Sequence, residues 1–567
     1  MPLFSILTPV FDTPADVLAA TLRSVRTQSF GDWELCLVDD CSTAPHVGEM
    51  LARAQREDDR IRVERRAENG GIVAASNDAL AMARGEFVAL LDHDDELHPA
   101  ALERVAAAIA AAPEADYLYT HEDKVDRAGR PSGPFFKPDW SPERMRTQMY
   151  TCHLSVMRRK LVEEVGGFDP EFEGSQDWDL VLRVTERARA VAHVPEVLYH
   201  WRTLETSTAG AGEEAKPWAF EAGRRAVQAH CERIGLPAQV ERDLDVPGVY
   251  HLQPRLQREP LVSIVIPTAG GSREVRFQEV VLIEHCLRSI AASSTYENYE
   301  IVVVTDGALD PALEDRLRGI AGDRLRLVPF EGEFNFSAKI NRGVVHSNGE
   351  RLLLLNDDME VVAPNWIERM VMYLELNEVG AVGGRLILED GRPQHVGILF
   401  ENGGYPGHIY HGFSPGFRGY SNNVLVAQNY LAVTAACLMT TREAFDEVGG
   451  FSAAFPSSYN DMDFCLKLRT TGRRVVYDPD TVLYHFESSS RNNEVEDWEK
   501  QQLLDRWLHL TATDPFTNPA LRHGLPRIGA GVRNVIGGLA RRSRLGRLRA
   551  VDSPPGSASP RARRRGR

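Results

Sequence analysis

A short acidic stretch closes one of the most apolar segments of the chain. Residues 87–91 are FVALL, and residues 92–96 are DHDDE. Four carboxylates within five residues repel one another, and a divalent cation at the exposed end of a buried strand would relieve that repulsion. The carboxyl ends of strands in open α/β sheets are also where ligands bind. The stretch predicts a Mg²⁺ or Mn²⁺ site at Asp92 and Asp94; the alternative is an acidic, solvated turn.

The same pattern occurs a second time, in the same relation to its surroundings. Residues 352–359 are LLLLNDDM, and Asp358 lies 264 positions after Asp94, as Asn341 does after Asn77. Further matched stretches follow in the same order along the chain: SILTP with SIVIP, LCLVDD with IVVVTD, VGGF with VGGF, DWD with DMD, and VLYH with VLYH. Matches in one order indicate an internal duplication, so we predict two modules of one kind.

Strands alternating with helices must position these acids. Apolar runs rich in β-formers predict first-module strands at 4–10, 33–38, 61–64, 87–91, 117–120 and 194–202. Helical periodicity between them predicts a mainly parallel sheet with helices on both faces. Asp40 and Asp94 follow strands, and Asp177 opens a helix, where the helix dipole favours an ionised carboxylate. The second module repeats these stations at Asp306, Asp358 and Asp461.

Length and composition set the domain plan and the compartment. A chain of 567 residues is too long for one ordinary core. We expect a first module at 1–205, a helical connector at 206–258, a second module at 259–520 and a basic tail at 521–567. The net charge of -16 argues against nucleic-acid binding. Seven scattered cysteines without a CxxC pair, and no signal peptide after Met1, predict a cytoplasmic protein with reduced thiols.

Two segments raise the question of a membrane. The weakly polar stretch at 424–439 is too short and too polar to span one, and we expect a buried strand pair there. The arginine-rich tail has two interpretations. A basic amphipathic helix at 528–551 would lie on an anionic surface at the inner face of the cell membrane. The alternative is a disordered, solvated tail.

Missing motifs exclude other uses of nucleotides. The sequence has no GxxxxGK loop and no GxGxxG after a strand, so ATP hydrolysis and hydride transfer lack support. A divalent ion, a diphosphate leaving group and a separate carboxylate base suit transfer from a nucleoside diphosphate donor.

The assembled motifs identify a family. In the first module they are TPVFD, LVDDCST, ENGGIVAASNDAL, GEFVALLDHDDEL, HEDKVD, PFFKPDW, VGGFDPEFEGSQDWDLVLR and VLYHWR. In the second they are VSIVIPT, FNFSAKINRG, LLLLNDDMEV, PQHVGI, VTAACLMTTREAFDEVGGF, NDMDFCLKLR and YHFESSSR. The chain resembles glycosyltransferase family 2 twice, over about 3–205 and 260–490. The resemblance implies two tandem α/β modules with the Rossmann-like type A glycosyltransferase fold. It also implies inverting transfer from a nucleotide-sugar.

The resemblance assigns expected roles to particular residues. Those expected at the donor are Pro9, Phe11, Asp40, Asn77, Pro267, Asp306 and Asn341. The metal carboxylates are Asp92, Asp94 and Asp358, and His200 and His485 approach the diphosphate or metal unless they are only strand-end residues. The catalytic bases are Asp177 and Asp461, with helix capping as the alternative. Glu122, Asp123, Lys137 and Trp140 are expected to shape the donor or acceptor pocket.

The second module departs from the family pattern at two places. Asn356 replaces the first acid of the metal motif, although the surface-polysaccharide rhamnosyltransferases that this module resembles use Asn there. Thr268 and Ala269 offer no aromatic ring for the base. We expect an inverting transferase that builds a cell-surface polysaccharide, with a glycan or lipid-linked acceptor.

Three alternatives remain open. One module is catalytic and the other binds acceptor, or the protein is a non-catalytic carbohydrate-binding scaffold. The third is a nucleotidyltransferase, for which the TPVFDTPAD stretch lacks the glycine-rich loop.

Overall fold

The computed structural model describes residues 1–127, 129–203, 217–401, 403–487, 495–518, 520–522 and 525–526. The first part of the predicted connector, residues 206–216, the end of the YHFESSSR motif and the basic tail beyond residue 526 lie outside these residues. Met1–Leu525 forms one compact unit. We keep the names first and second module for the parts of the chain that carry its two large sheets.

The first module contains a nine-stranded sheet in the order β3-β2-β1-β4-β8-β6-β9-β5, with β7 paired to β6. Its strands are β1 (Phe4–Val10), β2 (Trp33–Asp39), β3 (Ile61–Arg65), β4 (Phe87–Leu90), β5 (Glu96–Leu97), β6 (Ala115–Val125), β7 (Pro131–Phe135), β8 (Ser155–Arg158) and β9 (Ala190–Arg202). Strands β3, β2, β1 and β4 are parallel, which forms the Rossmann-like half. Strand β8 runs antiparallel to β4 and β6, so the sheet is more mixed than the sequence predicted.

The second module repeats this order as β16-β15-β12-β17-β24-β19-β25-β18, with β20 on β19 and β23 on β25. Its strands are β12 (Val262–Thr268), β15 (Tyr299–Asp306), β16 (Leu325–Phe330), β17 (Arg351–Leu355), β18 (Met359–Val361), β19 (Val379–Ile387), β20 (Pro393–His395), β23 (Gln428–Tyr430), β24 (Cys437–Thr441) and β25 (Arg474–His485). Small hairpins are β13 (Ser272–Val275) with β14 (Gln278–Val281), β21 (Ile398–Glu401) with β22 (Tyr405–His408), and β26 (Leu521–Arg522) with β27 (Leu525–Pro526). Two α/β modules of one topology confirm the predicted fold class.

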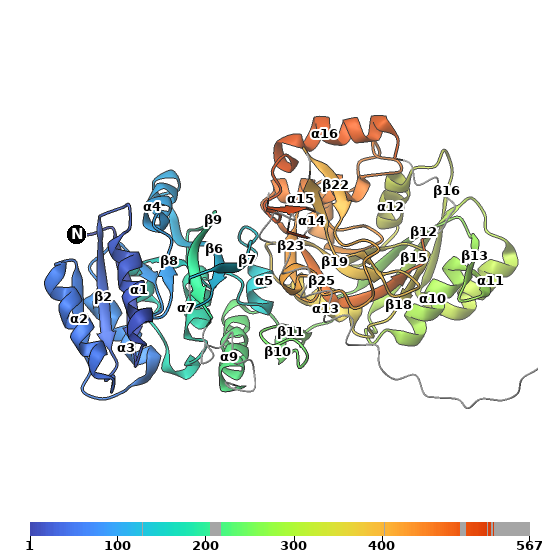
Figure 1. The fold of residues 1–567 in the computed structure, drawn as a ribbon. Helices are drawn as coiled ribbons and strands as arrows, with labels where there is room; N and C mark the ends of the chain where they lie inside the picture. Colours follow the sequence, from blue (N-terminus) through green and yellow to red (C-terminus); the bar gives the residue numbers. More distant parts are fainter. Residues whose placement is uncertain are drawn as a thin grey trace, which may run out of the picture. The chain divides into compact units, whose positions relative to one another are not determined.

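Helices connect and cover the strands in both modules (Figure 1). In the first they are α1 (Ala15–Arg26), α2 (Pro45–Glu57), α3 (Gly71–Met82), α4 (Ala101–Ala111), α5 (Pro142–Thr147), α6 (Arg159–Glu164) and α7 (Gln176–Thr185). In the second they are α10 (Leu282–Ser293), α11 (Pro311–Ala321), α12 (Phe336–Val345), α13 (Trp366–Tyr373), α14 (Arg442–Glu447), α15 (Asn460–Thr470) and α16 (Asp497–Thr511). Helix α3 packs on β1 and β2, and α12 packs on β12 and β15 in the matching place.

A repeated glycine explains part of the duplicated pattern. A Cβ at Gly85 would lie 2.6 Å from the backbone nitrogen of Ser5, and a Cβ at Gly349 would lie 2.6 Å from that of Ser263. Real Cβ atoms do not approach backbone so closely, so only glycine fits where the chain turns into β4 or β17. Both close approaches lie at the start of a strand that ends in acids.

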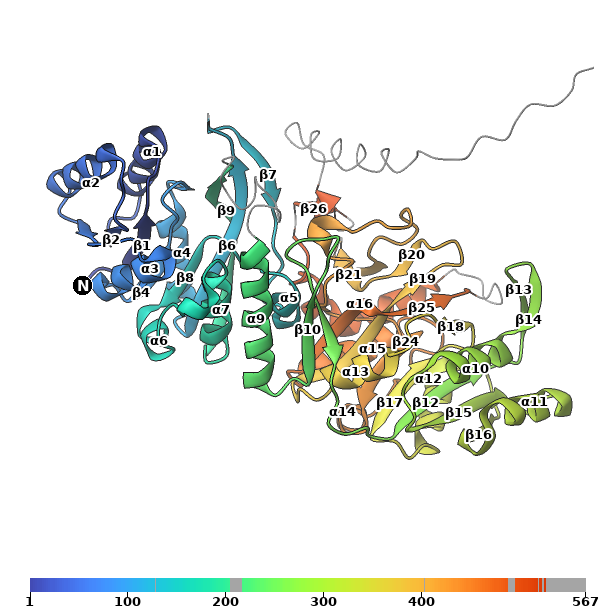
Figure 2. The same cartoon turned by 90° about the horizontal axis from the view of Figure 1, so that it is seen from below.

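The connector holds more than the expected helix. Helix α9 (Pro217–Ile234) is followed by a hairpin of β10 (Ala238–Arg242) and β11 (Tyr250–Pro254) (Figure 2). Helix α9 packs on α7 and on β10. In the weakly polar stretch, β23 pairs with β25 while β24 pairs with β17 and β19, so its two strands do not pair with each other. Among the described residues, no helix is both long and apolar enough to cross a bilayer.

Candidate active sites of the two modules

Parallel pairing gathers the predicted first-module residues at one edge of the sheet. Strand β1 lies between β2 and β4, so the carboxyl ends of all three strands meet there. Phe11 follows β1 and is 44% exposed, and Pro9 is half-buried beside it. An exposed aromatic side chain at this edge is available to pack on a ligand.

Asp40 lies at the same edge, but its carboxylate is bound by other groups of the protein. Its two carboxylate oxygens accept hydrogen bonds from the backbone N–H groups of Gly70 and Gly71, each at 2.9 Å. The guanidinium of Arg66 lies 3.0 Å away, and the carboxylate is buried. Asp40 therefore shapes the loop that opens α3, and the structure shows it holding this loop rather than facing open space.

The two predicted donor-site asparagines also have structural partners. Asn77 donates its side-chain N–H to the Phe168 carbonyl and accepts from the Phe168 N–H; Asn341 does the same with Phe451. A Cβ on Gly167 would lie 2.7 Å from the Asn77 Oδ1. The repeated Asn and the repeated Gly-Gly-Phe are thus one clamp that fixes a loop. We interpret both asparagines as structural, in place of the donor-site role expected from the sequence.

The acidic turn after β4 brings together a different pair of acids from the predicted one. Ligand atoms of Asp92, Asp95 and His153 lie within 4.8 Å of one another, and Asp94 is not part of this group. The His153 Nε2 is 4.0 Å from the nearer Asp92 oxygen. Asp95 is fully buried and accepts hydrogen bonds from the Tyr199 hydroxyl at 2.6 Å and the Arg202 backbone N–H at 2.7 Å. Burial, and then the charges of Asp92 and Asp94, raise the pKa of Asp95.

A buried ion network lies behind His153. Its Nδ1 is 3.3 Å from a Glu122 oxygen that also accepts from the Lys137 ammonium at 2.9 Å. Lys137 is fully buried and donates to the carbonyls of Thr151 and His153 as well. Burial alone would raise the pKa of Glu122, but Lys137 and His153 lower it to about 2. Burial opposes the charge on His153, yet Glu122 and the turn carboxylates raise its pKa to about 9.

His200 is not brought to the acidic turn. Its Nδ1 lies 2.6 Å from an Asp123 oxygen. In the sheet, His200 stands opposite Glu96, two residues beyond Asp94. His485 stands opposite Met359, one residue beyond Asp358. In strand pairing, the histidine therefore lies one residue further from the aspartate in the first module, and the metal-site role expected for His200 lacks a contact in this structure.

The second-module site is a hollow of about 300 Å³. It contains the predicted Pro267, Asp306, Asp358 and His485 among its lining residues. The complete lining is Pro267, Thr268, Ala269, Gly271, Leu282, Asp306, Phe334, Phe336, Lys339, Asn356, Asp357, Asp358, Gln394, His485 and Glu487. Strands β12, β15 and β17 supply its floor from the ends that parallel pairing aligns.

Asp358 and His485 are in direct contact at the floor of this hollow. The His485 Nε2 is 3.1 Å from the Asp358 Oδ1, and its Nδ1 is 2.7 Å from the Gln394 Oε1. Asp358 and then Glu487 and Asp357 raise the pKa of His485 against the opposing effect of burial. Asp357 accepts the Thr268 hydroxyl hydrogen bond, and burial raises its pKa to about 6.

An aromatic ring that the sequence reasoning missed lies in the same hollow. Phe334, in the loop before α12, is 48% exposed. The Lys339 ammonium lies 5.0 Å from its ring centroid and is also paired with Asp306. A stacking residue was expected after β12, whereas this ring comes from the chain after β16. The FNFSAKINRG motif contained the residue, but spacing alone does not reveal where the loop folds.

The expected bases open matching helices. Asp177 lies in the first turn of α7, and its charge is close enough to Asp92 to raise that carboxyl's pKa. Asp461 lies in the first turn of α15 and accepts the backbone N–H groups of Ala435 and Met462. Burial raises the pKa of both carboxyls. From the sequence, the helix dipole was expected to favour the ionised form of these two carboxyls. In the structure, the effect of burial is larger.

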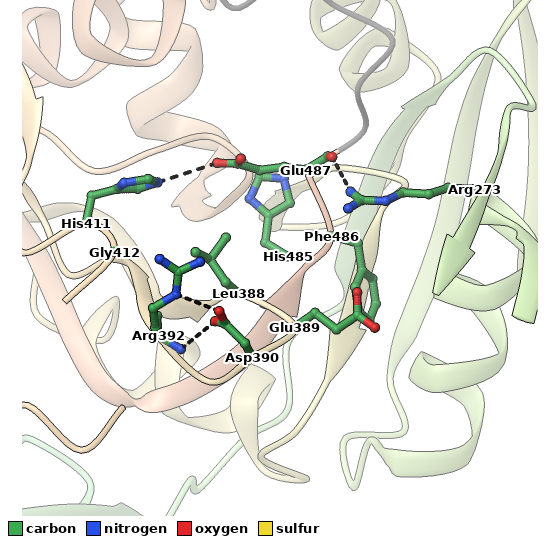
Figure 3. A pocket seen from close by; sticks show the side chains of 10 residues that line it. All are labelled: Arg273, Leu388, Glu389, Asp390, Arg392, His411, Gly412, His485, Phe486 and Glu487. Carbon is green, nitrogen blue, oxygen red and sulfur yellow. Dashed lines mark hydrogen bonds and ion pairs between the residues drawn. The ribbon is translucent and has the colours of Figure 1, made fainter. Parts of the chain in front are cut away.

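A larger hollow of about 700 Å³ shares His485 and Glu487 with the smaller one. Figure 3 shows Arg273 and His411 reaching Glu487 from two sides, with Arg392 paired to Asp390 below them. Phe486, which is buried, and Leu388 line it together with charged side chains.

Two segments that include the acidic turns of these sites match one known family model. The segments 5–166 and 263–449 each match Glycosyl transferase family 2. The chain belongs to glycosyl transferase family 2. The two matched segments carry both acidic turns, and the matched order of strands explains why one family model fits twice.

Relatives of the whole chain include two bacterial proteins. The chain is 39% identical over 535 residues to the uncharacterized protein y4gI of Sinorhizobium fredii, with 92% of this chain and 58% of that protein covered. It is 36% identical over 527 residues to the O-antigen biosynthesis protein RfbC of Myxococcus xanthus, with 92% and 40% covered. The chain therefore spans about half the length of these relatives. A solved structure of S. aureus TarS 1-349 with UDP-GlcNAc is 22% identical, with a TM-score of 0.34 over 40% of this chain and 66% of that one.

Proposed function

We propose that each module transfers a sugar from a nucleotide-sugar to a growing cell-surface glycan or lipid-linked acceptor, with inversion. The observation that supports this proposal is that the two modules have the same arrangement of acidic residues. Acids follow the central strand, an imidazole faces them, and a further aspartate opens the helix at 176 or 460. The relative named for O-antigen biosynthesis supports a polysaccharide product.

The donor of the second module would occupy the hollow of about 300 Å³. The exposed ring of Phe334 provides a face for the base, as Phe11 does in the first module. Asp306 and Lys339 are placed for the ribose and diphosphate. A base stacked on an aromatic ring contributes about 1–3 kcal/mol.

We propose a divalent cation, Mg²⁺ or Mn²⁺, at both acidic turns; among the described residues, a group of three possible ligands is found at the first turn. In the second module the Nδ1–H of His485 donates to the Gln394 oxygen, and Nε2 faces Asp358. A neutral ring so oriented directs a lone pair at a carboxylate, and a cation or a second proton resolves that conflict. When bound, the ion would neutralise the charge that develops on the leaving diphosphate. Calorimetry with a nucleoside diphosphate, with and without EDTA, tests this requirement; equal affinity in the two titrations would contradict it.

The acceptor hydroxyl loses a proton as it attacks the anomeric carbon from the side opposite the diphosphate. Asp177 and Asp461 are the proposed bases, and their raised pKa brings them closer to the operating pH of a general base. In the second module, the hollow of about 700 Å³ adjoins the donor hollow through His485 and Glu487. We place the acceptor glycan there.

A second candidate keeps one catalytic module and gives the other an acceptor-binding role. Asn356 stands where the first module has Asp92, and both oxygens of Asp461 accept backbone hydrogen bonds. These two features favour the first module as the catalytic one under this alternative.

One screen distinguishes the two candidates. Full-length protein is given a panel of nucleotide-sugars, and release of nucleoside diphosphate is measured for the wild type and for Asp177→Asn, Asp461→Asn and the double variant. Two independently lost activities support two enzymes. Loss only with Asp177→Asn supports one enzyme and one binding module, and equal release by the double variant contradicts transfer at these sites.

Peripheral membrane attachment is the remaining proposal, and it rests on sequence alone. Basic residues near an anionic surface contribute about 1 kcal/mol each. Residues 521–567 are rich in arginine, with Asp552 as their acid. Co-sedimentation with anionic vesicles should weaken in a chain that ends at 520 and at high salt; equal sedimentation of both chains would show that the tail does not attach the protein to the membrane.

A further inference from the structure

The two modules present an imidazole to their acidic turns in the same orientation but from different strands. In the second module His485, at the end of β25, directs Nδ1 to the Gln394 oxygen and Nε2 to Asp358. In the first, the Nδ1 of His153, just before β8, lies 3.3 Å from the Glu122 oxygen without hydrogen-bond geometry, and its Nε2 lies 4.0 Å from an Asp92 oxygen. An oxygen behind the ring and a carboxylate before it is the arrangement of metal-bound histidines.

Each module has only one of its two candidate positions filled in this way. His153 lies thirteen residues before the first glycine of VGGF, and the residue at that place in the second module is Ala436. His200 occupies the place of His485 but pairs with Asp123. The imidazole therefore comes from a different strand in each module, but in both modules it faces the acidic turn.

The surroundings of His153 are built to hold its orientation. Its ring stacks on Tyr199 with centroids 4.6 Å apart. Its backbone N–H donates to the same Glu122 oxygen that its ring faces, at 3.1 Å. Lys137 fixes that carboxylate from behind and is itself fully buried. The matching stretch of β19 carries Leu386 and Ile387, so this support is particular to the first module.

We infer that the Nε2 of His153, with Asp92 and Asp95, holds the divalent cation of the first module, in the place that sequence comparison gives to His200. The inference rests on the cation requirement of the proposed function. Glu122 and Lys137 act as positioning residues that orient the ring. Loss of the oxygen partner of a metal-bound histidine costs about 10- to 100-fold in metal affinity, and we expect loss of the histidine itself to cost at least as much.

Pulsed EPR of bound Mn²⁺ tests this directly, because it detects imidazole nitrogen at the metal. The parent is the full-length His485→Gln variant, which leaves the first module as the source of such nitrogen. The parent should show nitrogen coupling, and adding His153→Gln should abolish it and weaken Mn²⁺ binding by about 10- to 100-fold or more. Adding His200→Gln instead, as the matched control, should leave coupling and affinity unchanged.

Each other outcome has a definite meaning. Coupling that survives His153→Gln, or disappears with His200→Gln, overturns the inference while the cation requirement stands. A parent that binds no Mn²⁺ overturns the cation requirement and this inference together. Thermal unfolding confirms that each variant is folded, and His153→Asn serves in place of His153→Gln if the latter does not fold.

Discussion

The first and second modules share a frame but satisfy their acidic turns with different chemistry. The first supports its turn with buried charges, in which Lys137 holds Glu122 and Glu122 holds His153. The second uses a neutral amide, Gln394, behind His485. The comparison shows that the strand order and the acids at strand ends are the retained features of the duplication. The side chains that position those acids differ between the two modules.

Replacing the base should have the largest effect and should act on the modules separately. Asp177→Asn keeps the shape and the helix position of the carboxyl, so donor binding and folding should remain. General-base assistance provides about 10²- to 10⁴-fold, which is about 3 to 5 kcal/mol. We expect turnover of the first module's donor to fall by that factor, measured as nucleoside diphosphate release with the true acceptor. Near-normal turnover would remove Asp177 from the mechanism.

Removing the buried lysine should destabilise the first module and has no counterpart in the second. Lys137→Met leaves Glu122 buried without its ammonium partner, which typically costs about 3–5 kcal/mol. The double change Glu122→Leu with Lys137→Met copies the apolar character of Leu386 and should recover most of that loss. Urea unfolding of the three proteins measures this. Equal free energies of unfolding for wild type and Lys137→Met would show that the ion pair is not a structural support.

The same network should make stability depend on acid pH. The pKa of Glu122 is lowered to about 2 from an ordinary value of 4.5, so its contribution is complete above pH 4.5 and is lost as the pH falls toward 2. A shift of this size corresponds to about 3 kcal/mol. The Glu122→Leu with Lys137→Met protein should lack this part of the acid dependence. Parallel stability curves for the two proteins between pH 4.5 and 2 would contradict the assignment.

The smallest expected effect concerns the donor base. Phe334→Ala should weaken donor binding to the second module about tenfold, since ring stacking contributes about 1–3 kcal/mol per base. Phe11→Ala should do the same in the first module and leave the second unchanged. Titration of each variant with nucleoside diphosphates measures both. An unchanged affinity after Phe334→Ala would show that the base lies elsewhere in the hollow.

The sequence predicted what depends on chain order. Repeated strands, helix-opening aspartates and acids after apolar runs gave the duplicated α/β fold, and the structure confirms it. Asp358 and His485 were each predicted near the metal or diphosphate, and in the structure they lie 3.1 Å apart. These features follow from periodicity and from the rule that parallel strands align their carboxyl ends.

What the sequence missed depends on side-chain direction and pairing. His153 precedes strand β8 by two residues, and its approach to Asp92 follows from how β8 lies beside β4. His200 faces Asp123, and its strand pairing differs by one residue from that of His485. Asn77 matched a family position, yet its partner is a backbone 91 residues away. Such contacts are set by the packed structure and leave little trace in local pattern.

The length of the product made on a defined acceptor shows whether both modules transfer sugar. Full-length Asp177→Asn and Asp461→Asn proteins are each incubated with all required donors, and the products are measured by mass spectrometry. We expect elongation by each variant to end at a different product, and we expect a mixture of the two variants to make the wild-type product. If Asp461→Asn alone makes the full product, the second module is not a transferase, which contradicts the proposal that both modules transfer sugar.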